Sequence, residues 1–262
     1  MSNILNRNFE LEVARGNVTG QFAVNKFGRS TNVDNGVSTD IWDAADVTTN
    51  QAIWLAPTAA RLHDIASDST SDDGSPVGVG ARTLKIYGLQ TWSSVETNET
   101  ITMDGTTNVT TANSYVIIHR MVVITWGATS VNVGTITATA QTDATLTAQI
   151  SPSKGQTEMA IYGIPTSQKF YMYSFYVYYN KSAGVSGAID SSILCNSAPN
   201  SITTRYITKH TQGGVIDGTS GIVHDFKVPK IFEGPCIIKI QSVSSVNNVD
   251  VSAGFDGILI NN

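Results

Sequence analysis

The chain has 262 residues and a formal net charge of −5, and charged residues make up only 14% of it, against roughly 25% in typical soluble proteins. This length allows one large core or two ordinary ones. The scarcity of charge, with no cluster of Lys and Arg, argues against nucleic-acid binding through phosphates. No apolar run reaches the ~18–20 residues of a membrane span, so we expect no membrane partner either.

Residues 1–30 begin polar and continue through several glycines, with Phe22 and Phe27 among them. No helical periodicity fits this segment, and it has neither the apolar core nor the small-residue cleavage site of a signal peptide. We therefore expect an N-terminal arm over 1–30, or one or two short strands, partly laid on a neighbouring surface.

The next segment carries two tryptophans, Trp42 and Trp54. Each brings a large apolar area and one N–H that needs a partner, so we expect anchors of a core or a subunit interface. A short strand is expected over 61–67, followed by an exposed loop rich in Asp, Ser and Gly.

Four aspartates gather around this loop: Asp64, Asp68, Asp72 and Asp73. Oxygen-rich loops can hold Ca²⁺, but the spacing lacks the alternating acidic pattern and the terminal bidentate Glu of a calcium loop. The four are weak metal candidates, and we expect a solvated loop without a metal.

Apolar residues recur close to every second position over 82–126, on both sides of Asp104-Gly105. This period is typical of strands with one buried face, and the Asp-Gly pair suits a tight turn. We expect strands at about 83–90, 95–103, 115–126, 133–140 and 144–150, and a boundary in the turn-forming segment 151–156.

The second half contains an aromatic run that begins at Lys169. On a regular strand one face would hold Phe170, Met172, Ser174, Tyr176 and Tyr178, and the other Tyr171, Tyr173, Phe175, Val177 and Tyr179. Because both faces are apolar, we expect a central strand covered by a sheet on one side and a neighbouring subunit on the other. The interface candidates are therefore Phe22, Phe27, Trp42, Trp54, Phe170, Tyr171, Tyr173 and Phe175.

Further strands are expected at 187–195, 202–210, 221–228, 235–244 and 249–260, and helical signals are weak apart from a single turn near 40–48. Short, regularly spaced strands predict an all-β fold, an antiparallel β-sandwich of jelly-roll type. The length favours two sandwich modules in tandem, over 31–150 and 151–262. One enlarged sandwich is the alternative.

No arrangement of residues predicts catalysis or a cofactor, so we expect the protein not to be an enzyme. His63, His119, His210 and His224 lie in no recognisable catalytic motif, although His119-Arg120 interrupts an apolar strand and indicates a bulge or an interface. Glu96 and Glu99 would point to opposite faces of a strand, which argues against a glycosidase pair.

The two cysteines, Cys195 and Cys236, are too few for a disulfide framework. They either pair with each other or stay as small buried residues. The sequence does not decide between these alternatives.

Several stretches together resemble a family of virion structural proteins from tailed phages and related large viruses of aquatic microbes. They are 22–29 (FAVNKFGR), 40–43 (DIWD), 80–89 (GARTLKIYGL), 99–107 (ETITMDGTT), 114–115, 120–121, 134–138 (GTITA), 156–162 (QTEMAIY), 164–165 and 250–256 (DVSAGFD). The resemblance spans nearly the whole chain and brings no catalytic residues.

This resemblance implies a virion protein that is assembled onto a capsid or tail in the host cytoplasm, without a signal peptide. We expect a capsid decoration, cement or minor capsid protein whose partner is the major capsid protein. Many modest contacts can add up through multivalency, and a homo-oligomer, here a trimer, would suit capsid symmetry. The alternative is an adhesin of the tail or fibre that binds host glycan through exposed aromatic side chains.

Overall fold

The computed structural model describes residues 8–45, 51–180, 186–201, 205–217 and 219–262. Over these residues the chain is all-β, with antiparallel strands in four sheets. The helical segments are short: α1 (Phe9–Ala14) and a 3-10 turn, η2 (Asp43–Ala45). The predicted all-β antiparallel class is confirmed. Within the described ranges no helix has the length and apolar character needed to cross a membrane.

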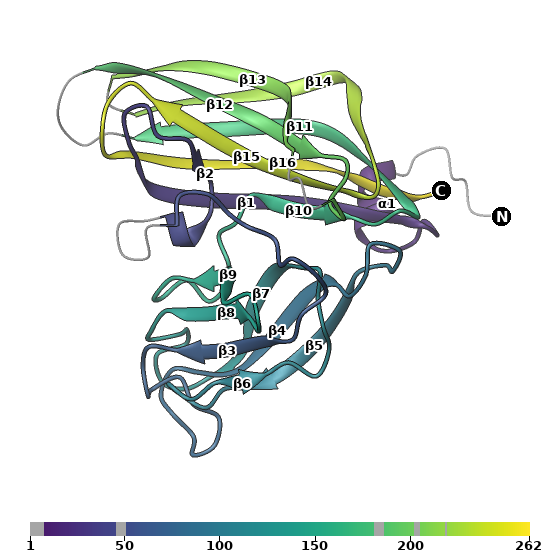
Figure 1. Ribbon diagram of the computed structural model, residues 1–262. Coiled ribbons are helices and arrows are strands. Elements are labelled where there is room, and N and C mark those ends of the chain that lie inside the picture. The colour runs from purple at the N-terminus through teal and green to yellow at the C-terminus, as the bar shows by residue number, and fades with distance from the viewer. Residues whose placement is uncertain (1–7, 46–50, 181–185, 202–204, 218) are drawn as a thin grey trace.

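Two of the sheets face each other and form the large sheet pair, drawn in the upper part of Figure 1. Sheet 1 has the order β1 (Gln21–Val33), β16 (Val249–Asn261), β11 (Gln168–Asn180), β14 (Thr219–Glu233). Sheet 2 has the order β10 (Ile161–Ile164), β15 (Cys236–Ser244), β12 (Gly187–Asn196), β13 (Ile207–Ile216), and β2 (Thr39–Asp40) also pairs with β15.

The other two sheets form the small sheet pair, which lies below β1 and β10 in Figure 1. Sheet 3 has the order β6 (Val109–Thr110), β3 (His63–Ser67), β8 (Ile136–Ala140), β9 (Thr145–Ile150). Sheet 4 has the order β5 (Thr97–Thr102), β4 (Ala81–Leu89), β7 (Ile117–Trp126). Most of these strands are short, and long loops connect them.

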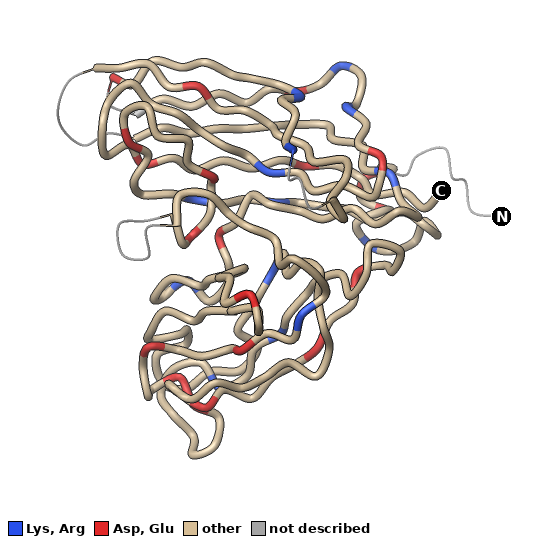
Figure 2. The backbone as a smooth tube through the Cα atoms, in the orientation of Figure 1, with Lys and Arg blue, Asp and Glu red and all other residues tan. Residues whose placement is uncertain are grey.

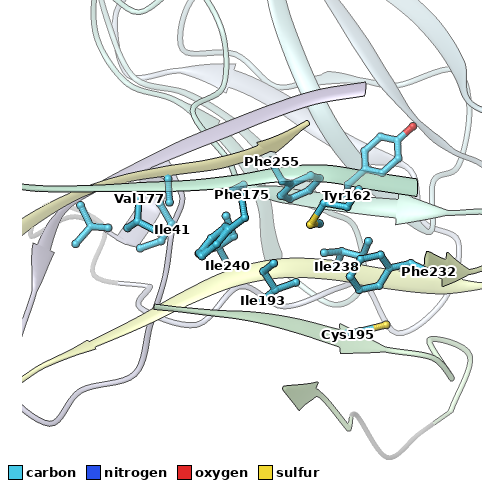
Figure 3. Close-up of a cluster of buried hydrophobic side chains, with 14 of the residues drawn as sticks. Ile41, Tyr162, Phe175, Val177, Ile193, Cys195, Phe232, Ile238, Ile240 and Phe255 are labelled. Carbon is cyan, nitrogen blue, oxygen red and sulfur yellow. The ribbon is translucent and has the colours of Figure 1, made fainter. Parts of the chain in front are cut away.

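Each sheet pair encloses its own hydrophobic core because alternate side chains of its strands point inward. In the large sheet pair, Phe175, Val177 and Phe255 of sheet 1 meet Ile193, Ile238 and Ile240 of sheet 2 (Figure 3). Complete burial of side chains of this size stabilises the fold by about 1.5–3 kcal/mol each. The core of the small sheet pair includes Leu84, Ile86, Met121, Ile65 and Ile136.

Of the two alternatives predicted for residues 1–30, an arm or short strands, the structure shows a strand, β1, over the last part of this segment. Its residues 21–30 pair with β16 of the same chain, from Gln21 opposite Ile260 to Ser30 opposite Val251. Gly28 lets this strand pass close to the backbone at Ile41 and Ala160. A Cβ at position 28 would lie 2.4 Å from atoms of both residues. The sequence signal for this strand was the alternation of inward and outward positions from Val24 onward.

The strand β11 departs from the regular alternation that the sequence analysis assumed. It lies in the middle of sheet 1, as expected, but its register shifts between Met172 and Ser174. An irregularity of this kind moves all later side chains to the opposite face. As a result Phe170 and Met172 share the buried face with Phe175, Val177 and Tyr179, which regular alternation had placed on the other one.

Most strands lie within a few residues of their predicted positions, but the strand expected over 221–228 is β14 and runs to Glu233, and the two-residue strands β2 and β6 were not predicted. The strand expected over 202–210 begins at Ile207 and runs to Ile216, and 202–204 fall outside the described residues. The single turn expected over 40–48 is η2 at Asp43–Ala45, and 46–50 are likewise outside the described residues.

A buried ion pair within sheet 2 joins β2 to β15. Asp40 and Lys239 are both buried, with 2.5 Å between Oδ2 and Nζ. The carboxylate also accepts hydrogen bonds from the Gln241 side chain at 2.9 Å and the Trp54 backbone N–H at 2.8 Å. These contacts satisfy both carboxylate oxygens, which a buried charge requires.

Candidate functional site

A cavity lined in part by polar side chains lies at the junction of the two sheet pairs. This cavity, the junction pocket, has a volume of about 650 Å³. Residues 22–27 of β1 form one wall, His119 and Arg120 of β7 another, and Tyr87, Glu96 and Tyr162 complete the polar lining. A pocket of this size between two packed units is a common place for a small molecule to bind.

Lys26 points into the molecule because it continues the inward alternation of Val24 on β1. Its side chain is only 7% exposed, and its ammonium donates a hydrogen bond to the backbone carbonyl of His119 at 2.5 Å. Burial, reinforced by the nearby positive charge of Arg120, lowers the pKa of Lys26 to about 7, although Glu96 and Asp43 act in the opposite direction.

His119 is the extra residue of a bulge in β7, since Tyr87 pairs with Arg120 while Gly88 pairs with Ile118. The bulge or interface predicted at His119-Arg120 is confirmed as a bulge. The bulge turns the imidazole inward, where it lies 4.6 Å from the Tyr162 ring, measured between centroids. Its Nδ1 atom is buried and has no hydrogen-bond partner among the described residues.

Glu96 pairs with His119, with 2.5 Å between Oε2 and Nε2. Burial lowers the pKa of His119, and the hydrogen bond that His119 donates to Glu96 only partly offsets this effect. Burial alone would raise the pKa of Glu96, but the hydrogen bond with His119 and the charges around it lower that pKa below its ordinary value. At neutral pH we therefore assign a neutral imidazole whose Nε2–H donates to an ionised carboxylate.

The junction pocket thus has apolar walls, one carboxylate that is already engaged, and two cationic groups. The guanidinium of Arg120 lies over the Tyr87 ring, 5.6 Å from its centroid, and donates to Gln156 Oε1 at 3.2 Å. The sequence did not lead us to Lys26 or to the role of Glu96. The available signal was a lysine at an inward-pointing position of an alternating strand.

The four aspartates proposed as weak metal candidates act as hydrogen-bond acceptors for the protein's own loops. Asp72 is fully buried, and its carboxylate accepts from the backbone N–H groups of Ala81, Val133 and Gly134 and from the hydroxyl of Ser67, all at 2.7–2.8 Å.

The other three aspartates each have partners of their own. Asp68 accepts from the Thr135 N–H, Asp73 from the Ser75 N–H, and Asp64 from the side chains of Thr110 and Gln141. No group of three His, Cys, Asp or Glu side chains suited to a metal occurs among the described residues. These carboxylates organise loops.

The interface candidates divide into buried and accessible residues. Trp42, Trp54, Phe170 and Phe175 are at most 1% exposed and belong to the cores, so they are not available to another subunit. The indole N–H of Trp54 donates to the Thr147 carbonyl at 2.8 Å and that of Trp42 to the Gln51 carbonyl at 3.1 Å. Phe22 and Tyr173 are exposed, and Phe27 and Tyr171 are partly exposed.

Exposed apolar side chains lie together on the outward side of sheet 1 along β11 and β14, and we call this patch the outer face. Strand register places Tyr171 beside Ile231 and Tyr176 beside Val223, with Tyr178 further along β11. Ile231 is 53% and Val223 57% exposed. Exposed apolar patches on a folded chain are typical of contact surfaces.

Neither sheet pair carries a surface dominated by one sign of charge within the described residues. Figure 2 shows acidic and basic residues interspersed over both, without a long block of one sign in the described part of the chain.

Cys195 and Cys236 are both buried as free thiols in the core of the large sheet pair. Each lies close enough to the other to share a hydrogen bond, which lowers the pKa of Cys195 and, together with burial, raises that of Cys236.

Comparison with known proteins gives no relative by sequence: no family model matches the chain, and no curated protein matches it. Among solved structures, the infectious bursal disease virus of the Gx strain aligns over 92% of this chain and 73% of its own, with 10% identity and a TM-score of 0.24. Particles of a mutant VP2 protein of the same virus align over 92% and 70%, with 10% identity and a TM-score of 0.20. At such scores the superposition does not define a fold.

Proposed function

We propose that the protein is a non-enzymatic structural component of a virion and that its large sheet pair is a jelly roll. The observation that carries this proposal is the strand order of the two sheets, β1-β16-β11-β14 opposite β10-β15-β12-β13. Followed along the chain from β10 to β16, the strands move between the two sheets in the pattern of two interlocked Greek keys. The small sheet pair is then an insertion between the first and second strands of the jelly roll, instead of a tandem module.

Jelly rolls of eight strands are used repeatedly in viral capsids and also in lectins, so the fold restricts the role without deciding it. The surface chemistry favours the structural role. Charged residues are only 14% of the chain, and the outer face presents exposed apolar side chains such as Val223 and Ile231. Modest apolar contacts repeated many times on a particle give firm attachment through multivalency.

Within the virion we propose a capsid decoration, cement or minor capsid protein that binds the major capsid protein through the outer face. The first test is the copy number per particle, measured by quantitative mass spectrometry of purified virions. Hundreds of copies in a simple ratio to the major capsid protein are expected. Complete absence from purified virions would overturn the proposal.

The contact surface is tested by charged substitutions on the outer face. Val223→Asp combined with Ile231→Asp is expected to lower incorporation into particles at least tenfold, because it places two charges in an apolar contact. Val77→Asp is the matched control, since Val77 is an equally exposed valine (65%) on a loop of the small sheet pair. Equal incorporation of both variants would exclude the outer face as the attachment surface.

The second candidate is an adhesin of the tail or fibre that binds glycan. Exposed aromatic side chains favour it, namely Tyr173, Tyr178 and Trp126, because sugars stack on such rings. Trp92 is only 7% exposed and does not belong to this set. Binding on a glycan array that is lost in Tyr178→Ala, together with a few to a few dozen copies per particle, would favour the adhesin over the decoration protein.

A further inference from the structure

We propose that the junction pocket is a binding site for a small organic carboxylate with an apolar body. The proposal is independent of the virion role, because it rests on the lining of the pocket and not on the jelly roll. Three observations carry it: an ammonium with unused donors, a second cation beside it, and apolar walls of suitable size.

The ammonium of Lys26 supplies the first anchor. An ammonium has three N–H donors, and the hydrogen bond to the His119 carbonyl is the one that Lys26 makes within the described residues. Two donors are therefore left for a ligand in a nearly buried position. Leaving such donors without acceptors costs free energy, and a carboxylate with two oxygens would satisfy both.

The charges around Lys26 favour an anion. The groups that act on it are Arg120 from β7, Glu96 from the segment before β5 and Asp43 from η2, and His119 contributes its carbonyl. Glu96 is engaged by His119 Nε2, while Asp43 accepts from the backbone N–H groups of Ser151 and Glu158. Neither acid forms a hydrogen bond with the Lys26 ammonium among the described contacts, so its free donors can meet a ligand anion, which would share the field of Lys26 and Arg120 with the Glu96 carboxylate.

The rest of the pocket is suited to an apolar body. Phe22, Val24, Val95 and Leu259 belong to the lining. Phe22 is 49% and Val95 52% exposed, so the pocket opens to solvent at these residues. A volume of about 650 Å³ lies within the roughly 300–1,000 Å³ of small-molecule sites. A linear carboxylate of medium chain length fits both the charged and the apolar parts.

Binding should be linked to protonation of Lys26. The lysine has a pKa of about 7 in the free protein, and a carboxylate beside it favours the charged form. Binding near neutral pH should therefore take up a fraction of a proton, and the affinity should fall as the pH rises from 6.5 to 8.5. A merely apolar pocket would show neither effect.

The test uses octanoate as the probe in isothermal titration calorimetry with the full chain, and 1-octanol as the uncharged control. We expect octanoate to bind at least tenfold more tightly than octanol at pH 6.5. Lys26→Met should abolish that preference, because methionine keeps an apolar stem without a charge. Lys169→Met, at an exposed lysine paired with Glu233, is the matched control and should leave the affinity unchanged.

Several outcomes would overturn the proposal: no octanoate binding at millimolar concentration, equal affinity for octanoate and octanol, or unchanged affinity in Lys26→Met. If Lys26→Met does not fold, Arg120→Gln at an exposed position and the pH series on the unaltered protein decide the question. Affinity that is unaffected by both Arg120→Gln and pH would refute the anion site.

Discussion

Both sheet pairs consist of antiparallel strands with alternating inward and outward side chains, but different interactions stabilise them. The large sheet pair has long strands, such as β11 and β16 with 13 residues each, and a continuous core of aliphatic and aromatic side chains. The small sheet pair has shorter strands, and buried polar side chains such as Asp72, Asn132 and Asp43 tie its loops to the sheets. Loss of a core side chain should therefore lower the stability of the whole large sheet pair. Loss of a buried carboxylate should instead loosen individual loops of the small sheet pair.

The largest effect is expected from a cavity in the large sheet pair. Phe255 is fully buried and lies 5.7 Å from Phe170 between ring centroids. Phe255→Ala should lower the free energy of unfolding by about 3–5 kcal/mol, measured by urea denaturation. Phe9→Ala, at an exposed phenylalanine of α1, should change it little. Equal losses in the two variants would contradict the assignment of the core.

A smaller and more local effect is expected from Asp72 in the small sheet pair. Asp72→Ala leaves three backbone N–H groups and one hydroxyl without their acceptor and should cost about 2–3 kcal/mol. Limited proteolysis should then cut within 68–80 well before the large sheet pair is attacked. Asp73→Ala, which loses one exposed contact with Ser75, is the neighbouring control and should be cut no faster than the unaltered protein.

The junction between the sheet pairs should respond to pH through Lys26. The pKa is lowered from 10.5 to about 7 in the folded state, so between these values the unfolded chain binds more protons. Stability from this group therefore rises with pH across that window, by up to about 1.4 kcal/mol per pH unit. Lys26→Met removes the effect, so the stability difference between variant and unaltered protein should change steadily from pH 7 to 10. A constant difference would contradict the lowered pKa.

The smallest effect is expected from calcium. Because the carboxylates of Asp72 and Asp68 already accept backbone hydrogen bonds, millimolar Ca²⁺ should leave the melting temperature unchanged. Differential scanning calorimetry with and without a chelator measures this. A rise of several degrees with Ca²⁺ that disappears in Asp68→Asn would show that the loop binds the ion after all.

Local pattern in the sequence was enough to predict most strands and the turn at Asp104-Gly105, because a period of two and an Asp-Gly pair report on neighbouring residues. It could not predict which strands pair. β1 pairs with β16, which lies more than 200 residues later in the sequence, and no local pattern in either strand specifies this pairing. A one-residue irregularity after Met172 was equally invisible, yet it reverses the faces of the aromatic strand.

The candidate site was harder to predict than the fold for a related reason. Lys26, Glu96 and His119 lie on separate segments and meet only because the small sheet pair packs beside β1. The aspartates show the converse: close spacing in sequence made them weak candidates for a shared metal site, whereas each side chain accepts hydrogen bonds from different groups of the protein. Residues close in the sequence therefore did not form a common site, whereas residues far apart in the sequence did.

The pairing of β1 with β16 also sets an order of events during synthesis. A ribosome produces residues 21–33 first, and these have no partner until residues 249–261 have emerged. The strands of the small sheet pair all lie between 63 and 150 and so emerge well before that, but its core is completed by Ile237 of β15. The nascent chain therefore carries β1 without its partner for most of its translation. Sheet 1 can be completed only after β16 has emerged, because β16 pairs with both β1 and β11.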